Sequence, residues 1–192
     1  MPDVFVISDT HFGHENICKF TDLNGNKLRP FENATEMDEV MIEKWNSRVR
    51  PNDKVYHLGD VTLNRKLAIM LRLNGTKVLI KGNHDQAKLS EYAKYFKDVR
   101  SVHLLDKYFM LSHVPIHETS LIEGYVNMHG HTHERCLASA KYLNVCVECT
   151  GYEPIELNAA RAWSMLRLGR EADEKKRRGY LDTFKRNADE TV

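Results

Sequence analysis

Short apolar runs recur along the chain, and each of them ends in polar residues. Runs of this length that are rich in β-branched and aromatic residues are typical of buried strands. Five strands are therefore predicted, over residues 4–7, 54–58, 78–80, 109–111 and 125–128.

The segments between these runs carry apolar residues at helical spacing. The clearest predicted helix starts at Thr35, where Thr35 and Asp38 form a capping-box pattern, and it must end before Pro51. Three more helices are expected, over residues 67–73, 86–96 and 159–166, the last one stopping before Gly169. Strands that alternate with helices favour an α/β layered sandwich with parallel strand pairs.

Length and charge narrow the class of protein. A chain of 192 residues suits one domain with a single large core. Lys and Arg total 28 against 27 Asp and Glu, a net charge of +1, so no overall field attracts the protein to nucleic acid or to a membrane. No basic leader and no apolar run of about 18 residues is present, so we expect a cytoplasmic protein without a membrane segment.

We expect two parts in the chain. Residues 1–169 should form the functional domain, and residues 170–192 a charged tail that is helical or packed against a partner. Monomer and homodimer both stay open.

Four cysteines do not make a disulfide framework in a chain of this size. Cys146 and Cys149 have Cys-x-x-Cys spacing, which is common at redox and metal sites. In the β-like run expected here, an offset of three sends the two sulfurs to opposite faces. Both are therefore predicted to be buried thiols.

The ten histidines are the unusual feature of the composition. Several follow the predicted strands, at the edge where open α/β sheets place their chemistry. Asp9 and His11 are two residues apart, so an extended chain would point both toward one ion, and His131 and His133 repeat this spacing. Polar residues that follow the other strands complete a candidate set of metal ligands: Asp60, Asn83 and His113.

This set contains four imidazoles, two carboxylates and one amide oxygen, enough for two divalent ions if a carboxylate bridges them. Nitrogen and oxygen donors without thiolate suit manganese, iron, nickel or zinc. Two ions about 3.5–4 Å apart can clamp a phosphoryl group and activate a water between them. A single His or Asp at the end of a strand is usually a turn or cap residue. Five strands that are all followed by residues able to bind a metal indicate one shared site.

The motifs Asp-x-His, Gly-Asp, Gly-Asn-His-Asp, Ser-His and Gly-His-Thr-His follow one another between residues 9 and 133. In this order they resemble the signature of the calcineurin-like metallophosphoesterase superfamily, and the opening stretch most resembles its small bacterial and phage phosphoesterases. The resemblance implies a four-layer α/β/β/α sandwich with a two-metal centre at the strand ends. It further implies the following ligands: Asp9, His11 and His133 for the first metal, Asn83, His113 and His131 for the second, and Asp60 as the bridge.

The resemblance also implies that His84 lies beside the leaving-group oxygen and donates a proton to it, which typically speeds such a step by a factor of about 100 to 10,000. Asp85 is expected either to orient His84 or to cap the helix that starts near residue 86. His14 and His117 are candidates for contacts with the substrate phosphate, as is Asn83, and an outer or surface role is the alternative for the two histidines. Weaker candidates for phosphate contacts are Asn64, Arg65 and Lys81.

The function expected from the resemblance is a metal-dependent phosphohydrolase that acts on a phosphodiester of nucleotide or nucleic-acid type. Its cofactors would be two divalent ions, Mn²⁺ first, with Ni²⁺, Fe²⁺, Zn²⁺ and Mg²⁺ as alternatives. A phosphomonoesterase acting on a nucleotide, a small molecule or a phosphoprotein is the second interpretation. Phosphoprotein phosphatases of this superfamily have an Arg directly before Gly-Asn-His, where this chain has Lys81, and this disfavours that class. A non-catalytic scaffold would have lost ligands, and none is missing from the motifs.

Overall fold

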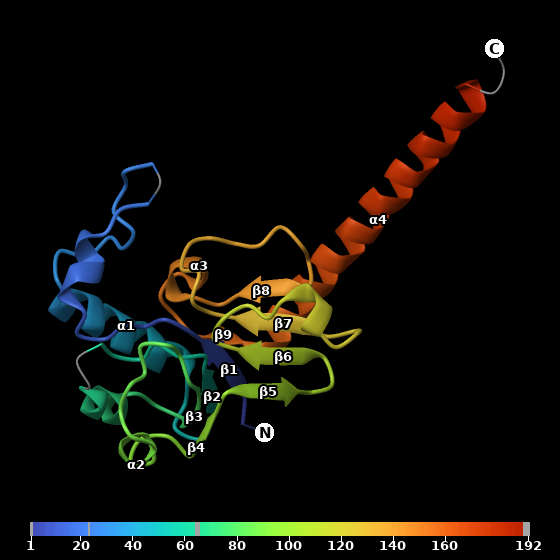
Figure 1. Cartoon of the computed structure of the whole chain (residues 1–192). Helices are drawn as coiled ribbons and strands as arrows, with labels where there is room; N and C mark the ends of the chain where they lie inside the picture. The colour runs from blue at the N-terminus through green and yellow to red at the C-terminus, as the bar shows by residue number, and fades with distance from the viewer. Residues whose placement is uncertain (1, 23, 64–65, 190–192) are drawn as a thin grey trace.

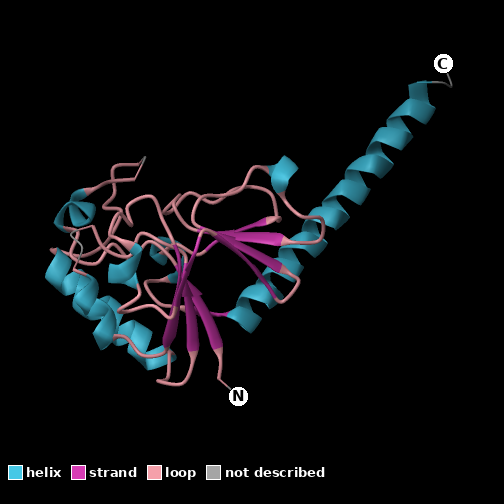
Figure 2. Cartoon of the chain, turned by 60° about the horizontal axis from the view of Figure 1, so that its bottom comes forward, coloured by secondary structure: helices cyan, strands magenta, loops and turns pink. Residues whose placement is uncertain are grey.

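Two β-sheets lie against each other with helices on their flanks (Figures 1 and 2). The computed structural model describes residues 2–22, 24–63 and 66–189, with side chains as far as residue 174. Asn64 and Arg65, two of the candidate phosphate contacts, lie outside the described residues, as does the end of the expected tail, residues 190–192. The predicted α/β class and its layered arrangement are confirmed.

The first sheet has the strand order β4-β3-β2-β1-β9. Its strands are β1 Val4–Ile7, β2 Lys54–His57, β3 Thr76–Ile80, β4 Asp98–Arg100 and β9 Ile155–Glu156. The first four are parallel, and β9 runs antiparallel to β1. Because the carboxyl ends of β1, β2 and β3 meet at one edge, the segments that carry Asp9, Asp60 and Asn83 leave the sheet side by side.

The second sheet has the strand order β5-β6-β7-β8. Its strands are β5 Val102–Leu105, β6 Phe109–Ser112, β7 Val126–His129 and β8 Tyr142–Asn144. The last three are parallel, and β5 runs antiparallel to β6. His113 follows β6 directly, and His131 and His133 follow β7.

The helices are short apart from α1 and α4. Their bounds are η1 Glu15–Lys19, α1 Ala34–Arg48, η2 Leu67–Arg72, α2 Leu89–Tyr92, η3 Glu118–Ser120, α3 Val147–Thr150 and α4 Leu157–Asp189. The N-cap of α1 is Asn33, whose side chain accepts from the backbone N–H of Glu36 at 2.9 Å, so the predicted start at Thr35 was two residues late.

Several predicted helices differ from the observed ones. The segment 67–73 folds as 3-10 helix η2, and the segment 86–96 contains only the four residues of α2. The last helix continues through Gly169 as far as Asp189, because an isolated helical Gly lowers helix stability without ending a helix. Four observed strands were not predicted, namely β4, β5, β8 and β9.

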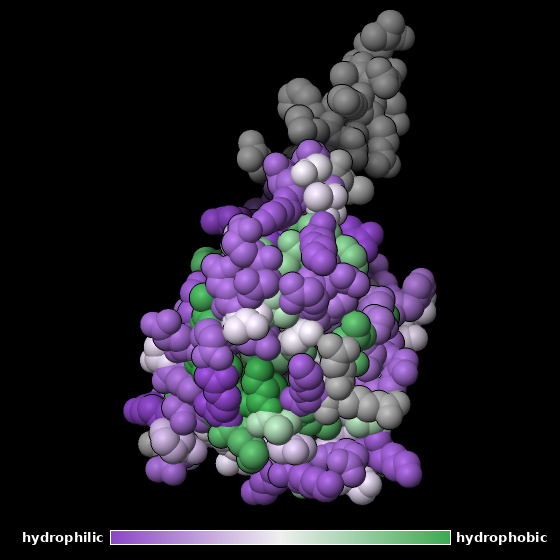
Figure 3. Space-filling view, turned by 90° about the vertical axis from the view of Figure 1, so that its left-hand side faces the viewer, coloured by the Kyte–Doolittle hydropathy of each residue, from purple (hydrophilic) through white to green (hydrophobic). Residues whose placement is uncertain are grey.

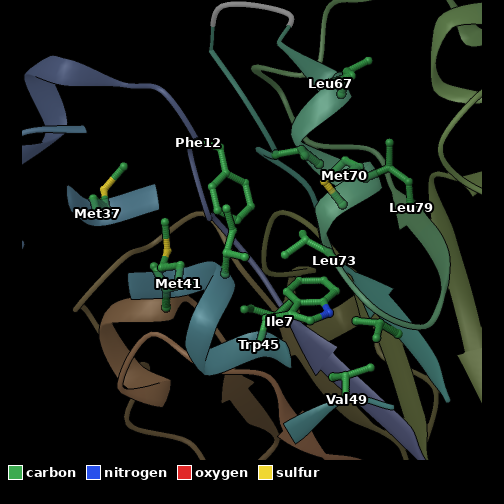
Figure 4. Close-up of a cluster of buried hydrophobic side chains, with 14 of the residues drawn as sticks. Ile7, Phe12, Met37, Met41, Trp45, Val49, Leu67, Met70, Leu73 and Leu79 are labelled. Carbon is green, nitrogen blue, oxygen red and sulfur yellow. The ribbon is translucent and has the colours of Figure 1, made fainter. Parts of the chain in front are cut away.

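Two hydrophobic cores hold the layers together. One lies between the first sheet and α1 with η2, and it contains Phe12, Trp45 and Met70 (Figure 4). The other fills the space between the two sheets. Ile7 of β1 belongs to the first core and Val6 to the second, so this strand is buried on both faces and the segment after it leaves from a fixed position.

Helix α4 packs against the body through its first turns and then projects away from it (Figure 1). Leu157 and Ala160 enter the core between the sheets, while Trp163 is exposed. Polar side chains cover most of the face drawn in Figure 3, with apolar ones showing between them. Among the described residues, no helix combines the length and the apolar character that crossing a membrane requires.

Candidate metal centre

Most of the predicted ligands have a left-handed backbone conformation rather than an extended one. Five of them have positive φ: Asp9 at 57°, His11 at 50°, Asp60 at 56°, His131 at 68° and His133 at 50°. The left-handed region is unusual for residues other than Gly, costs about 1–3 kcal/mol per residue and clusters at functional sites. The sequence argument that an extended chain points Asp9 and His11 to one side was therefore wrong in its geometry, although the two side chains do come together.

Glycines in the motifs allow the segments that carry the ligands to approach one another closely. A Cβ on Gly59 would lie 2.5 Å from the backbone nitrogen of Gly82, and a Cβ on Gly82 would overlap the carboxylate of Asp60. A Cβ on Gly130 would overlap the side chains of Ser8 and Asp9. The Gly that precedes each of Asp60, Asn83 and His131 thus serves the close approach of neighbouring segments.

Asp9, His11 and His133 form the first group of converging side chains. Each offers an atom within 4.8 Å of the others, which is close enough for one ion. Asp9 Oδ2 accepts from Ser8 Oγ at 2.6 Å and from the backbone N–H of His131 at 2.9 Å, whereas its Oδ1 is buried without a partner. Both ring nitrogens of His11 are also buried and unpartnered.

The second group contains Asp9, Asp60 and His113. Asp60 Oδ2 lies 3.7 Å from His11 Nε2 and 3.4 Å from His113 Nε2, between the two groups. Asn83 Oδ1 lies 2.8 Å from His113 Nε2 and 3.0 Å from His131 Nδ1. The structure therefore brings all seven predicted ligands together, with Asp60 in the middle.

The ionisable groups influence one another across this cluster. Burial disfavours the charged forms of Asp9 and Asp60, but the neighbouring imidazoles outweigh it and hold both pKa values below the usual range. Burial also opposes protonation of His113, yet the carboxylates of Asp60 and Asp9 raise its pKa. The carboxylates and imidazoles thus stabilise each other's charged forms across the cluster.

The donor set fits divalent metal ions. Buried polar atoms without a hydrogen bond are rare in folded proteins, and each one calls for an explanation such as a bound ion. Here Asp9 Oδ1 and His11 Nε2 are both buried and unpartnered, and they lie 3.7 Å apart. The thiol of Cys146 is a donor to Asp9 Oδ2 at 3.3 Å, and burial raises its pKa, so the cluster carries oxygen and nitrogen ligands without thiolate.

The histidines and the lysine predicted to contact substrate differ in their distance from the cluster and in their exposure. The rings of His84 and His14 lie 5.7 and 5.8 Å from the ring of His11, His84 being exposed and His14 half-buried. His117 is the N-cap of η3 and bonds with Thr119 of its own turn; no contact among the described residues joins it to the cluster. Lys81 is exposed beside Gly82.

Asp85 has a role that the sequence did not indicate. Its carboxylate accepts from the backbone N–H groups of Gly82 at 2.8 Å, Asp60 at 2.9 Å and Val61 at 3.1 Å. It therefore ties the segment after β3 to the segment after β2. Neither a bond to His84 nor a helix cap at residue 86 is among its contacts with described residues.

Sequence reasoning missed Arg29 and Glu148, which lie directly behind the cluster. Glu148 Oε1 accepts from His133 Nδ1 at 2.9 Å and from Arg29 Nε at 2.8 Å. Burial opposes ionisation of Glu148, but His133 and Arg29 hold its pKa below the usual range. Glu148 lies within the Cys-x-x-Cys stretch, whose spacing suggests a role for the two sulfurs and not for the carboxylate. Arg29 belongs to no recognisable local motif.

The prediction for the two cysteines was wrong in part. Cys146 is the N-cap of α3 and is buried, while Cys149 lies on that helix and is exposed. The stretch is therefore a helical turn, not a strand. Cys149 Sγ lies 3.8 Å from Cys136 Sγ.

Comparison with known proteins places the chain in a family. Residues 3–148 match the model of the calcineurin-like phosphoesterase superfamily domain. An uncharacterized protein of Methanocaldococcus jannaschii, MJ1445, is 36% identical over 171 residues, which cover 82% of this chain and 89% of that protein. A protein of unknown function from Aquifex aeolicus, AQ665, superposes with a TM-score of 0.64 at 28% identity, covering 85% of this chain and all of that one. An archaeal phosphodiesterase superposes with a TM-score of 0.43 at 22% identity, covering 78% of this chain and 86% of that one.

The matched segment contains every predicted ligand from Asp9 to His133 and extends to Glu148. It spans both sheets apart from β9, so the match covers the fold as well as the cluster. Members of this family bind divalent metal ions, and the Asp and His groups described above are suited to hold them. From its motifs, its fold and this match, the chain belongs to the calcineurin-like phosphoesterase superfamily.

Proposed function

We propose that this protein is a two-metal phosphodiesterase that acts on a diester of nucleotide or nucleic-acid type. The first ion would be held by Asp9, His11 and His133, with Asp60 shared between the ions. The second would be held by Asn83, His113 and His131. The observation that supports this proposal is a pair of buried atoms without a hydrogen bond, Asp9 Oδ1 and His11 Nε2, which lie 3.7 Å apart.

The ions and the chain have separate tasks in this proposal. When bound, two divalent ions supply positive charge to the phosphoryl oxygens and lower the pKa of the attacking water. The chain fixes the ligands through hydrogen bonds. Asp9 Oδ2 accepts from three donors, and Asp60 Oδ1 accepts from the backbone N–H of His84 at 2.9 Å. One oxygen of each carboxylate therefore stays free for an ion. Oxygen and nitrogen donors make Mn²⁺ the first candidate, with Fe²⁺, Ni²⁺ and Zn²⁺ next.

His84 is the proposed general acid. Its ring is exposed and 5.7 Å from the ring of His11, so a substrate bound at the ions lies within its reach. An alkoxide leaving group needs a proton, and donating it contributes a factor of about 100 to 10,000. His14, whose ring lies 5.8 Å from that of His11, is the proposed contact for the phosphate.

The state of Arg29 favours a diester over a monoester. A monoester phosphate carries about two negative charges near neutral pH, and arginine is the usual residue that grips it. Arg29 lies against the cluster, but its guanidinium is fully buried and bonded to the carbonyls of Asp9 and Thr10 and to Glu148. It is not available to substrate, and a singly charged diester has less need of it.

One experiment tests both the metals and the substrate class. Metal-free protein receives Mn²⁺, Ni²⁺, Zn²⁺ or Mg²⁺, and hydrolysis of bis-p-nitrophenyl phosphate, p-nitrophenyl phosphate and an alkyl nucleotide diester is compared. The expected result is hydrolysis that requires metal and is faster on the diesters. Faster hydrolysis of the monoester would move the function to a phosphomonoesterase.

Substitution of His84 tests the general acid. His84→Asn should lower turnover about 100-fold or more on the alkyl diester and much less on the aryl esters, which need little protonation. His103→Asn is the matched control, since His103 lies on β5 with Tyr56 and Arg100 as its contacts. Equal losses on every substrate would contradict the role given to His84.

A further inference from the structure

Arg29 is a completely buried cation in the loop between η1 and α1. Its Nη2 donates to the carbonyl oxygen of Asp9 at 2.6 Å, and its Nη1 donates to that of Thr10 at 2.9 Å. Its Nε donates to Glu148 Oε1 at 2.8 Å. A buried charge is strongly unfavourable unless it is paired and hydrogen-bonded, so these contacts are the reason that this side chain is tolerated there.

Glu148 connects the arginine to a predicted ligand. Its side chain is 3% exposed, and the oxygen that accepts from Arg29 also accepts from His133 Nδ1 at 2.9 Å. A carboxylate on Nδ1 fixes the imidazole tautomer and leaves Nε2 as the free donor atom. The ring of His133 is then stacked on that of His11, with centroids 5.4 Å apart.

The same ion pair also holds strained backbone. Asp9 and His11 both have positive φ, and the carbonyls bound by Arg29 belong to Asp9 and to Thr10 between them. A planar guanidinium reaches several acceptors in fixed directions, which the single ammonium of lysine does not. Arg29 thus acts on the two ligands after β1, while Glu148 acts on the ligand after β7.

We propose that Arg29 and Glu148 are positioning residues for the first metal site, formed by Asp9, His11 and His133. This inference rests on the proposed function only in taking those three residues as ligands. One buried ion pair sets the tautomer of one ligand and the backbone of the other two. The second site, with Asn83, His113 and His131, is outside its direct contacts.

The test is titration of the full-length, metal-depleted protein with Co²⁺. Glu148→Ala should weaken the first site about 10- to 100-fold, and Glu148→Gln, which keeps an oxygen for the His133 N–H, should weaken it less. Arg29→Lys should weaken the first site as well. The second site should keep its affinity in all three variants. Glu39→Gln is the matched control, because Glu39 pairs with exposed Arg72 on the surface.

A second measurement separates positioning from a merely structural role. In the Co²⁺-loaded protein, the Nδ1–H of His133 should give a shifted proton resonance that exchanges slowly with water in the wild type and rapidly in Glu148→Ala. A structural role alone would lower the thermal midpoint of the metal-free protein while leaving Co²⁺ affinity and this resonance unchanged, and that result would overturn the proposal. If Glu148→Ala does not fold, Glu148→Gln and Arg29→Lys are judged by their Co²⁺ affinity at the first site, which should fall below that of the wild type.

The outcomes also distinguish this inference from the proposed function. Wild-type affinity at the first site of a folded Glu148 variant overturns the inference alone. Two Co²⁺ ions bound without hydrolysis of any diester overturn the function, while the affinities of the variants still decide the inference. A wild-type protein that binds no metal overturns both.

Discussion

At the scale of single residues, the candidate site depends on close backbone approach as much as on its ligands. Gly130 lies against Ser8 and Asp9, and Gly59 lies against Gly82. The motifs therefore combine two requirements: a side chain that binds a cation, and a preceding Gly that lets two loops meet. The residue types could be recognised from the sequence because both requirements fall within a few neighbouring positions.

Gly130→Ala should disrupt the first metal site. The added Cβ would overlap the side chains of Ser8 and Asp9, so the segment after β1 or the segment after β7 must shift. We expect the free energy of unfolding to fall by at least about 2 kcal/mol, together with a loss of metal at this site. Urea denaturation and elemental analysis measure the two effects. Gly169→Ala is the control: nothing lies within 4 Å of a Cβ there, and the helix should gain up to about 1 kcal/mol. Similar losses in both variants would contradict this explanation.

Asp38 should make stability depend on pH. It accepts from the backbone N–H of Gly13 at 3.0 Å, and burial raises its pKa to about 6 despite this bond. Because the folded pKa exceeds the unfolded value of 3.8, the folded protein holds this proton more tightly. The resulting stability is present below about pH 4 and is lost as the pH rises through 6.

Asp38→Asn keeps an oxygen for Gly13 and removes the charge. We expect it to be more stable than the wild type by about 1–2 kcal/mol at pH 7, less than the full shift implies because the side chain is partly exposed. The difference should vanish near pH 4. Urea denaturation of both proteins at pH 4, 5.5 and 7 measures it, and a difference that is the same at all three would show that the charge is not the cause.

At the scale of elements, what the sequence could predict depends on burial and length. Strands β1, β2, β3, β6 and β7 lie inside the sheets, so their apolar runs are distinct. Strand β4 is three residues long and β9 two, and their pairing is decided by neighbours far along the chain. Segment 86–96 has helical periodicity. Many of its backbone N–H groups, however, form hydrogen bonds in turns around Tyr92 and Phe96 rather than in a continuous helix.

The start of α1 offers a direct test at this scale. Asn33 is the N-cap, with its side-chain oxygen 2.9 Å from the backbone nitrogen of Glu36. Asn33→Ala should lower the free energy of unfolding by about 1 kcal/mol. Thr35→Ala, an exposed change inside the first turn, should leave it unchanged or slightly higher. Thermal and urea denaturation compare the two, and the reverse order would place the cap at Thr35 as the sequence pattern suggested.

At the scale of the whole molecule, the site exists because two sheets present their strand ends at one place. The sequence showed which residues follow strands, and the family resemblance supplied the expected assignment of these residues to two metal ions. Neither the sequence nor the resemblance showed that Arg29, from the loop before α1, pairs with Glu148 of α3. Nor did they show that Glu148 bonds to His133. Arg29 and Glu148 are 119 positions apart, and only the folded arrangement of both sheets brings them within hydrogen-bonding distance.

The last part of α4 is the other feature that belongs to this scale. Every predicted ligand lies before residue 134. In α4, Glu171 Oε2 accepts from the backbone N–H of Ala140 at 2.9 Å, and the helix then projects away from the body (Figure 1). Protein ending at residue 174 should therefore bind both metals and lose no more than about 0.5 kcal/mol of unfolding free energy. Protein ending at Gly169 removes that bond and cuts the helix where the expected tail begins, so it should be about 1 kcal/mol less stable with the same metal content. Elemental analysis and urea denaturation of the two truncated proteins measure these quantities. Loss of metal from the folded protein that ends at residue 174 would mean that the tail, or a partner chain bound by it, contributes to the site.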